Sequence, residues 1–429
     1  MNINEYETLI GAETLERIWQ KAKPLTGRQV VHISSTYYGG GVAAMLGPLS
    51  LLMNDVGLHT EWRTIQGNPD FFAFTKAVHN ALQGAEIQLT DHVKWIYEQT
   101  NRDNAVRNQL NHDFVIVHDP QPLSLIQSYS RPVPWIWRCH IDLTAPNPLL
   151  WEYLGGFIDR YNAVIVTIPE YTQKIRPPQF YFMPAIDPFS LTNVDLGAEH
   201  IDHILESARI PTDKPLVVQV SRFDRWKDPQ GVIDAFKIAR RDVECTLVLL
   251  GAPAADDPEG QSIYESLLSQ QDERLLIINR EDSLLVNALQ RRATVVLQKS
   301  LREGFGLTVA EALWKGTPVI GGNVGGIRYQ IRDGVNGFLV SSVAEAAGRI
   351  IQVVRDQALR ERLGAAAHET VRRKFLLSRS LEQYLDLLNS FEIVVQVREN
   401  REIERAMLVP DAPVESAVPT DAALAPVAG

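Results

Sequence analysis

The sequence has little cysteine and no pattern that holds a metal ion. Of its 429 residues only Cys139 and Cys245 are cysteines, and each lies inside a strand-like run. We therefore expect two buried free thiols rather than a disulfide, as is usual in a reducing cytoplasm. No Asp-x-Asp occurs, and no cluster of His, Cys and Asp has metal-ligand spacing. The sequence accordingly predicts no metal site.

Long apolar runs and an excess of positive charge are also missing. No run reaches the length of a membrane span, and the N-terminus has no apolar signal-peptide segment. The net charge of −10 and the pI of about 5.6 argue against nucleic acid or an anionic membrane as a partner. A chain of 429 residues that is 45% hydrophobic is typical of a globular protein with more than one domain. We expect a cytoplasmic protein.

The stretch from Ser300 to Gly326 organises the rest of the chain. An apolar run at 294–297 predicts a buried parallel strand, and a glycine-broken loop follows it. Helical spacing then runs from Leu307 to Lys315, before another strand at 318–321. Such a loop lies at the carboxyl edge of a parallel sheet, beside free backbone N–H groups and the positive end of a helix. The pattern predicts a site for a polyhydroxylated ligand that carries phosphate.

Two carboxylates of this stretch, Glu303 and Glu311, are open to three interpretations. Both can bind the ligand. Thr308 and Glu311 also have the spacing of a capping box, in which Glu311 satisfies the start of its own helix. A glycosidase acid and nucleophile pair is the third interpretation, but eight helical residues rise about 12 Å. Such a pair needs roughly 5–10 Å, so the spacing disfavours it.

The segment from Glu303 to Glu311 resembles the E-x7-E motif of the retaining, nucleotide-sugar-dependent glycosyltransferases of family 4. The resemblance implies an α/β GT-B fold, in which two Rossmann-like, doubly wound domains face each other across a cleft. It also implies that Glu303 binds hydroxyls of the donor sugar and that Glu311 binds the ribose. The loop and helix start between them would complete the donor site: Gly304, Phe305, Gly306, Leu307 and Thr308.

A run of three glycines follows the first expected strand. Gly39, Gly41 and Ala44 fit the dinucleotide fingerprint, and Glu61 lies twenty residues after Gly41, so a dehydrogenase is one interpretation. The acid of that fingerprint should end the second strand, whereas Glu61 opens it. We interpret the glycines as a loop that brings backbone close to a phosphate or sugar. Family 4 enzymes have such a loop here, and the resemblance assigns Gly40 and Gly41 to the donor.

Aromatic residues are dense between residues 135 and 151. Aromatic faces pack on the C–H faces of sugars while polar neighbours bind hydroxyls, although these tryptophans could equally be strand core. His140 falls where its strand ends, which favours a place in the site. We expect Trp137, Asp142 and Asn147 to contact the acceptor sugar.

Three longer strings resemble the trehalose-forming members of family 4, which join a nucleotide-activated glucose to free glucose. The strings are WRCHIDLTAPN, HDFVIVHDPQPL and FFAFTKAVHNALQG, and the resemblance covers the chain from about Gln29 to Phe391. It implies that His140 lies near the reacting anomeric centre or the 6-hydroxyl of a sugar.

A basic pair, Arg222 and Lys227, follows the first strand expected in the second half. Asp228 and Pro229 then form a strong N-cap and N1 pair, so a helix begins directly after Lys227. Diphosphates bind at such strand–loop–helix junctions, although a solvated basic loop is the alternative. Family 4 enzymes hold the donor diphosphate with an Arg and a Lys here. We predict that the catalytic groups are His140, Glu303, Arg222 and Lys227.

The expected domain organisation has five segments. Residues 1–27 form an N-terminal helix and linker, and 28–190 form the first Rossmann-like domain, which holds the acceptor. Residues 210–375 form the second Rossmann-like domain, which holds the donor. Residues 376–405 form helices that cross back to the first domain, as the resemblance implies. The Ala- and Pro-rich tail at 406–429 is expected to be disordered.

The predicted reaction is transfer of glucose, with retained α configuration, from a nucleoside-diphosphate glucose to glucose, giving α,α-trehalose. No cofactor or metal is expected, because Arg222, Lys227 and a helix start would hold the diphosphate. A trehalose phosphorylase and a synthase for another acceptor such as a sugar phosphate are alternatives. A non-catalytic sugar-binding protein is an alternative of another class. The nucleobase, the physiological direction and a homodimer are left open by the sequence.

Overall fold

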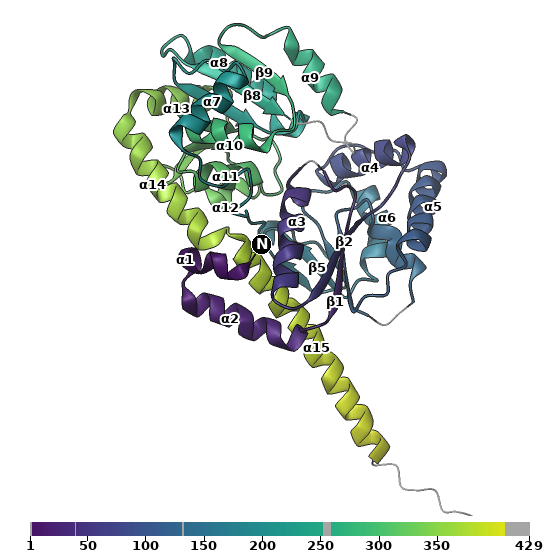
Figure 1. Ribbon diagram of the computed structural model, residues 1–429. Helices are drawn as coiled ribbons and strands as arrows, with labels where there is room; N and C mark the ends of the chain where they lie inside the picture. The colour runs from purple at the N-terminus through teal and green to yellow at the C-terminus, as the bar shows by residue number, and fades with distance from the viewer. Residues whose placement is uncertain (1, 39, 131–132, 252–258, 408–429) are drawn as a thin grey trace, which may run out of the picture.

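Two parallel sheets form the framework of the protein (Figure 1). The computed structural model describes residues 2–38, 40–130, 133–251 and 259–407, with side chains up to Glu392. Each sheet has six strands, all paired in parallel, and helices pack around both sheets. The predicted α/β fold of two Rossmann-like domains is confirmed.

The first sheet runs in the order β2-β1-β3-β4-β5-β6, so the strand order reverses between β1 and β3. Open α/β sheets bind ligands beyond the carboxyl ends of their strands at such a reversal. The strands are β1 (Gln29–Ser34), β2 (His59–Thr64), β3 (Phe114–His118), β4 (Trp135–Arg138), β5 (Ala163–Val166) and β6 (Gln179–Tyr181).

The second sheet runs in the order β12-β11-β10-β7-β8-β9, and its order reverses between β7 and β10. The loops after these two strands are the ones that carry Arg222, Lys227 and Glu303. The strands are β7 (Leu216–Val220), β8 (Thr246–Gly251), β9 (Leu275–Asn279), β10 (Val295–Gln298), β11 (Val319–Gly322) and β12 (Gly337–Val340).

The helices follow the strands in each half of the chain. The N-terminal segment forms α1 (Glu7–Ile10) and α2 (Ala12–Ala22). The first domain has α3 (Gly40–Asp55), α4 (Pro69–Leu82), α5 (Asp91–Asn108) and α6 (Pro148–Ile158). The second has α7 (Ala198–Ser207), α8 (Pro229–Ala239), α9 (Gly260–Leu268), α10 (Ser283–Arg292), α11 (Leu307–Trp314), α12 (Ile327–Gln330), α13 (Val343–Arg355) and α14 (Gln357–Lys374). The last helix is α15 (Leu377–Met407).

The strands are apolar because both faces of each sheet are covered. Every residue of β3, β7 and β8 is buried, as expected of parallel strands with helices on both sides. Cys139 and Cys245 are buried and free, as predicted. Most of the strand residues that are exposed or half-buried belong to the outer strands β2, β6, β9 and β12.

Helix α15 returns from the second domain to the first, where it packs on α2 and α3 (Figure 1). Arg17 of α2 pairs with Glu382 at 2.6 Å, and Lys21 pairs with Asp386 at 2.8 Å. Exposed pairs of this kind contribute little to stability, about 0–1 kcal/mol each. The crossing is therefore held mainly by apolar contacts.

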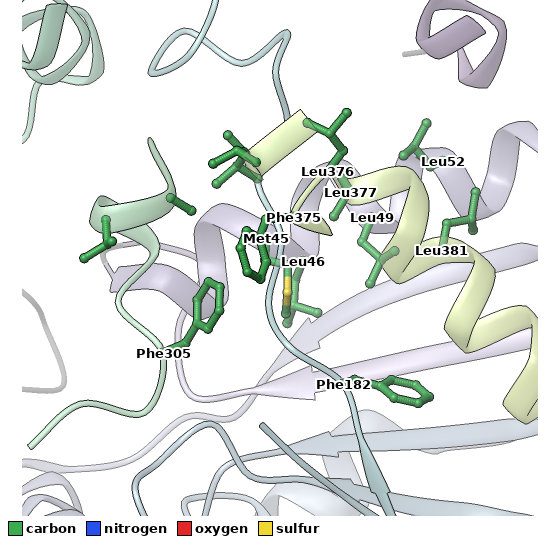
Figure 2. Close-up of a cluster of buried hydrophobic side chains, with 14 of the residues drawn as sticks. Met45, Leu46, Leu49, Leu52, Phe182, Phe305, Phe375, Leu376, Leu377 and Leu381 are labelled. Carbon is green, nitrogen blue, oxygen red and sulfur yellow. The ribbon is translucent and has the colours of Figure 1, made fainter. Parts of the chain in front are cut away.

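Those apolar contacts continue from the crossing to the cleft between the domains. Figure 2 shows Leu377 and Leu381 of α15 beside Leu49 of α3 in one buried cluster. Phe305, from the loop before α11, packs on Phe375 with ring centroids 5.5 Å apart. Because Phe305 belongs to the predicted donor loop, the core of the crossing also anchors the site.

Two sequence predictions concern residues outside those that the structure describes. Gly39, part of the proposed dinucleotide fingerprint, is one of them, and residues 408–429 contain almost all of the predicted disordered tail. Among the described residues, no helix is both long and apolar enough to cross a bilayer.

Candidate functional site

A cavity of about 340 Å³ lies between the two domains, within the range of roughly 300–1,000 Å³ usual for small-molecule sites. The first domain contributes the start of α3, part of α4 and the residues after β3 and β4. The second contributes the loops after β7, β9 and β10 and the start of α11. The cavity brings together these predicted site residues: Gly40, Gly41, His140, Arg222, Lys227, Glu303, Gly304, Phe305, Gly306, Leu307, Thr308 and Glu311.

Lys227 and Glu303 form an ion pair in this cavity. Nζ of Lys227 lies 2.6 Å from Oε2 of Glu303, and Oγ of Ser300 donates to the same oxygen at 3.0 Å. Glu303 is only 6% exposed, and Arg222 lines the same cavity. A cation that can bind phosphate therefore contacts a carboxylate that can accept hydrogen bonds from sugar hydroxyls.

The backbone that presents Lys227 is fixed by two caps. The carboxylate of Asp224 accepts from the N–H of Trp226 at 2.8 Å and begins the 3-10 turn that contains Lys227. Asp228, at a φ of 51°, then accepts from the N–H of Gly231 and begins α8, as predicted. A Cβ on residue 231 would lie 2.2 Å from Oδ2 of Asp228, so this cap requires glycine. Lys227 thus sits between two fixed turns.

The start of α11 is capped by backbone alone. Its N-cap residue is Gly306, at a φ of 84°, and no side chain caps the helix. Oγ1 of Thr308 donates instead to Oε1 of Gln298 at 3.2 Å. The capping-box interpretation of Thr308 and Glu311 is therefore wrong, because Thr308 lies inside the first turn. The N–H groups of that turn border the cavity and favour an anion there.

Glu311 lies one turn further along α11 and is buried, at 9% exposed. Burial raises the pKa of its carboxyl, while the neighbouring ammonium of Lys315 and the amide of Gln290 oppose that shift. Lys315 in turn donates to the side-chain oxygens of Asn193 and Gln290, both at 2.9 Å. Glu311 reaches the cavity from a polar network that holds it in place, and its contact with a ribose stays a prediction.

Two glycines mark where the domains touch at the cavity. A Cβ on Gly41 of α3 would lie 2.9 Å from Cδ1 of Leu307 of α11. A Cβ on Gly304 would lie 1.9 Å from the carbonyl oxygen of His140. No larger residue fits at position 304 unless the domains move apart. The predicted role of the glycine loop in closing the first domain on a ligand agrees with this geometry and is not tested by it.

His140 lines the cavity from the first domain. Its backbone N–H donates to Oδ1 of Asp119 at 2.8 Å, and its Nε2 lies 3.0 Å from Nδ1 of His118. Burial and then the guanidinium of Arg138 lower the pKa of His140 well below its usual value. His140 is therefore a neutral imidazole that can donate and accept hydrogen bonds.

The three residues predicted to contact the acceptor do not line the cavity. Trp137 is fully buried in the core, and its indole N–H donates to the carbonyl of Asp119 at 2.9 Å. Asn147 caps α6. Asp142 accepts from the backbone and hydroxyl of Thr144. The prediction of direct contact is corrected for Trp137 and Asn147, since strand packing and helix capping already occupy these side chains. Oδ2 of Asp142 lies 3.7 Å from the guanidinium of Arg302, which lines the cavity, so its contact with an acceptor stays a prediction.

Helix α4 and its C-cap residue Gln83 supply site residues that the sequence analysis missed. His79 and Gln83 are one helical turn apart and both line the cavity, as does Arg302 of the second domain. Burial, followed by the nearby ammonium of Lys76 and guanidinium of Arg222, lowers the pKa of His79 to about 3. The string FFAFTKAVHNALQG contains both residues, and their spacing of four positions was the available signal.

Polar contacts join the domains around the cavity. Nζ of Lys76 lies 2.9 Å from Oδ2 of Asp224, and both side chains are buried. Burial disfavours the ionised Asp224, but Lys76 and the cations at 222 and 227 outweigh it and hold the pKa of that carboxyl below its usual range. The hydroxyl of Tyr171 donates to the carbonyl of Glu303 at 2.7 Å. The two domains are thus in contact at two places beside the site.

Comparison with known proteins agrees with this architecture. Residues 32–173 match the family "Trehalose synthase, N-terminal domain", and residues 201–370 match "Glycosyl transferases group 1". The chain is 43% identical to a trehalose synthase of Pyrococcus horikoshii over 404 residues, which cover 90% of this chain and 96% of that protein. A trehalose phosphorylase of Pleurotus pulmonarius is more distant, at 27% identity over 86% of this chain and 58% of its own length.

A solved structure supports the fold independently of close sequence similarity. The sucrose-phosphate synthase of Thermosynechococcus elongatus has a TM-score of 0.67 at 18% identity, covering 86% of this chain and 100% of that one. This likeness shows the GT-B fold. Because the chain matches a glycosyltransferase family model and a trehalose synthase at 43% identity, the dehydrogenase and glycosidase interpretations of the sequence are wrong. The matched families, the close relative and the cleft architecture together place the chain in the trehalose synthase family of GT-B glycosyltransferases.

Proposed function

We propose that the protein transfers glucose from a nucleoside-diphosphate glucose to the anomeric hydroxyl of glucose and forms α,α-trehalose. The observation that carries this proposal is the contact between Lys227 and Glu303 at 2.6 Å inside the cavity. In a nucleotide sugar a single oxygen atom links the phosphate to the sugar ring that carries the hydroxyls. Its two recognition groups should therefore lie within a few ångströms of each other, as these two side chains do.

The charge that develops on the leaving diphosphate is the main demand of the reaction. Arg222, Lys227 and the N–H groups at the start of α11 would hold it, since all of them border the cavity. Fixed donors aimed at developing charge stabilise a transition state more than a ground state. We propose on this basis that transfer needs no metal ion.

The transfer itself exchanges one bond for another at the anomeric carbon. The bond from C1 of the donor glucose to the phosphate oxygen breaks, and a bond from C1 to the acceptor's anomeric oxygen forms on the same face. The proton of the acceptor hydroxyl passes to the leaving phosphate oxygen. The products are a nucleoside diphosphate and trehalose with both anomeric carbons in the α configuration. No protein nucleophile takes part in this scheme.

Residues of both domains would hold the sugars during that exchange. Glu303 accepts from donor hydroxyls, and the neutral ring of His140 bonds a hydroxyl near the reacting centre from the opposite side. His79 and Gln83, which line the first-domain part of the cavity, are suited to an uncharged acceptor. Glu311 would accept from the ribose.

The principal alternative is cleavage of trehalose by inorganic phosphate on the same fold. A phosphorylase has no ribose to bind. The buried carboxyl of Glu311 lies in the cavity lining beside the ammonium of Lys315 and the amide of Gln290, and it supports a nucleoside donor. A synthase acting on a sugar phosphate would need a second anion site, and the further arginines of the cavity already face carboxylates. Arg280 lies 2.9 Å from Asp282, and Arg302 lies 3.7 Å from Asp142.

Product analysis tests the proposal directly. The protein is incubated with glucose and each of ADP-, UDP- and GDP-glucose, with glucose 6-phosphate replacing glucose in parallel reactions. A further reaction contains trehalose and phosphate only. Trehalose from one or more nucleotide sugars and free glucose is the expected product. Glucose 1-phosphate from the last reaction, without transfer from any nucleotide sugar, would favour the phosphorylase.

A further inference from the structure

Three histidines, two of them buried and His140 partly buried, lead from the cavity into the first domain. His32 lies on β1, His118 ends β3, and His140 follows β4 by two residues. These strands are neighbours, and in their register His32 pairs with Ile116 and His118 with Arg138. Each histidine therefore stands two residues further along its strand than the one before. Since side chains alternate along a strand, a step of two keeps all three on one face.

The three imidazole rings are joined through their nitrogens. Nε2 of His140 lies 3.0 Å from Nδ1 of His118, and Nε2 of His118 lies 3.0 Å from Nδ1 of His32. Ring centroids of the two pairs are 5.3 and 5.2 Å apart. His32 and His118 are 0% and 1% exposed, so water does not compete for the contact between these two rings. The spacing of adjacent strands, about 4.8 Å, is what allows the rings to meet.

The surroundings keep all three rings neutral. Burial and then the guanidinium of Arg138 lower the pKa of His32 to about 3. Burial, the neighbouring rings and Arg138 lower the pKa of His118 well below its usual value. The guanidinium of Arg138 donates to the hydroxyl of Tyr384 on α15, whose ring lies edge-on to His32. A neutral imidazole has one N–H and one bare nitrogen, so each ring must donate in one direction only.

The far end of the chain sets that direction. Nε2 of His32 lies 3.5 Å from Sδ of Met53 on α3. A thioether accepts hydrogen bonds but cannot donate one, so the proton of His32 belongs on Nε2 and its Nδ1 is bare. The proton between His32 and His118 then belongs to Nε2 of His118, and the same step places a proton on Nε2 of His140. Nδ1 of His140 is left bare, and no described group bonds to it.

The three histidines fix where each ring proton lies, but they do not relay protons. A proton relay needs an exit, and a thioether in the core neither takes up nor releases a proton. Met53 is fully buried in the cluster between α3 and α15. The chain of rings therefore ends inside the protein and fixes a tautomer.

We propose that His118 and His32 are positioning residues that hold His140 in its Nε2–H tautomer, which makes Nδ1 a permanent acceptor for a hydroxyl of the sugar bound in the cavity. The part concerning the sugar rests on the proposed function. The tautomer itself does not, and it can be measured without turnover.

Nitrogen-15 NMR of histidine-labelled protein is the first test. Nε2–H and bare Nδ1 nitrogens have well-separated shifts, and the His140→Gln and His32→Gln variants assign the signals by their loss. The wild-type protein should show His140, His118 and His32 all protonated at Nε2. An Nδ1–H tautomer at His140, or an imidazolium at neutral pH, would overturn the proposal whether or not the protein makes trehalose. Met53→Leu, which changes volume little, should leave His32 as a mixture of tautomers.

Two variants at position 118 connect the tautomer to activity. His118→Phe removes the acceptor for Nε2–H of His140, whereas His118→Asn offers an amide oxygen near the position of Nδ1. We expect kcat/KM to fall about three- to tenfold in the Phe variant, the equivalent of one hydrogen bond. The Asn variant should recover most of that loss and retain the Nε2–H signal of His140.

His112→Phe is the matched control. His112 is also a buried histidine of the first domain, at 5% exposed, but it does not line the cavity or belong to the chain of rings. It should lower the melting temperature without moving the His140 signals. If His118→Phe is too unstable to purify, the wild-type and Met53→Leu spectra still decide the tautomer. Equal activity of the Phe and Asn variants, with an unchanged His140 spectrum in both, would show that His118 is only core.

Discussion

The two domains line the same cavity with opposite kinds of chemistry. On the second domain Arg222, Lys227 and Glu303 lie within two loops, and Lys227 and Glu303 touch at 2.6 Å. On the first domain the groups at the cavity include His140 and His79, both with pKa values held below the usual range by burial and nearby cations. Asp119 also lines this side, and its Oδ1 accepts from the backbone N–H of His140 at 2.8 Å. The second domain presents several formal charges, whereas the first presents mainly neutral groups, with the carboxylate of Asp119 as its charged one.

This difference matches the two things that the proposed reaction must recognise. A diphosphate carries charge that grows as it leaves, so fixed cations stabilise it increasingly along the reaction. A glucose acceptor carries only hydroxyls. A neutral imidazole in a fixed tautomer accepts at one nitrogen and donates at the other, so it can orient such a hydroxyl. A charged group opposite the acceptor would have to be desolvated without a counterion, which is costly. The four predictions below test this division, from the largest expected effect to none.

Removal of a cation on the charged side should have the largest effect. A charge-assisted hydrogen bond contributes roughly 1.5–3 kcal/mol, which is about tenfold to a hundredfold in binding. Because Arg222 and Lys227 would also stabilise the leaving group, Arg222→Ala and Lys227→Ala should each lower kcat/KM by about a hundredfold or more, with a loss in kcat. Calorimetry with the nucleoside diphosphate measures the ground-state part, and KM for glucose at saturating donor should change little.

The same loop provides the control for that experiment. Arg225 lies between the two cations in sequence, but it stacks on Trp226 and does not line the cavity. Arg225→Ala should keep nucleoside-diphosphate affinity within about twofold of the wild type, because exposed charges contribute little. Wild-type affinity in both Arg222→Ala and Lys227→Ala would remove the donor from this side of the cleft.

Glu311→Gln should have an intermediate effect, confined to the donor. Loss of a hydrogen bond to the ribose should raise KM for the nucleotide sugar by about tenfold, while KM for glucose is unchanged. Burial raises the pKa of the Glu311 carboxyl, so ionisation costs the folded state more than the unfolded state. The Gln variant should therefore not melt earlier at neutral pH. A lower melting temperature with unchanged kinetics would make Glu311 purely structural.

On the neutral side we expect His32 to make the free energy of unfolding depend on pH. His32 has a pKa of about 3 in the folded protein and about 6.5 when unfolded. Below pH 6.5 the unfolded chain takes up a proton that the folded protein refuses, so stability is lost as pH falls from about 6.5 towards 3. His32→Asn should reduce this slope by about 1.4 kcal/mol per pH unit in that window. Chemical denaturation at several pH values measures it, and an unchanged slope would show that His32 is not held neutral.

The charged side could be predicted because its residues are close together in the sequence. Arg222 and Lys227 lie in one loop, and Glu303 to Glu311 lie in one loop and helix, so strand ends and helix starts indicated their place. Burial and parallel pairing followed from apolar runs for the same local reason. The capping-box interpretation was wrong because the spacing of Thr308 and Glu311 does not say where the helix begins. The N-cap residue is Gly306, two positions before Thr308.

On the neutral side the end of a strand indicated the place of His140, but the residues around it could not be predicted in the same way. The contacts among His32, His118 and His140 depend on the register of three strands, which the sequence does not state. Trp137 was misplaced for a related reason, since strand alternation turns it away from the face that carries His140. His79 was missed because a histidine on an apolar helix is ordinarily core, and only the approach of the second domain makes it part of a site.

The last prediction is the absence of an effect. If the two sides differ in this way, the positive charge that neutralises the diphosphate comes from Arg222, Lys227 and the first turn of α11. Excess EDTA should then leave turnover unchanged. A metal-dependent transferase with an Asp-x-Asp pair, assayed in the same buffers, verifies that chelation is complete. Lys227→Ala sharpens the test, because Mg²⁺ can then replace part of the missing charge and should restore some activity, while it adds nothing to the wild type. Loss of wild-type activity in EDTA that Mg²⁺ or Mn²⁺ restores would show that a metal ion, and not the protein, neutralises the diphosphate. The contrast between the two sides of the cleft would then no longer explain catalysis.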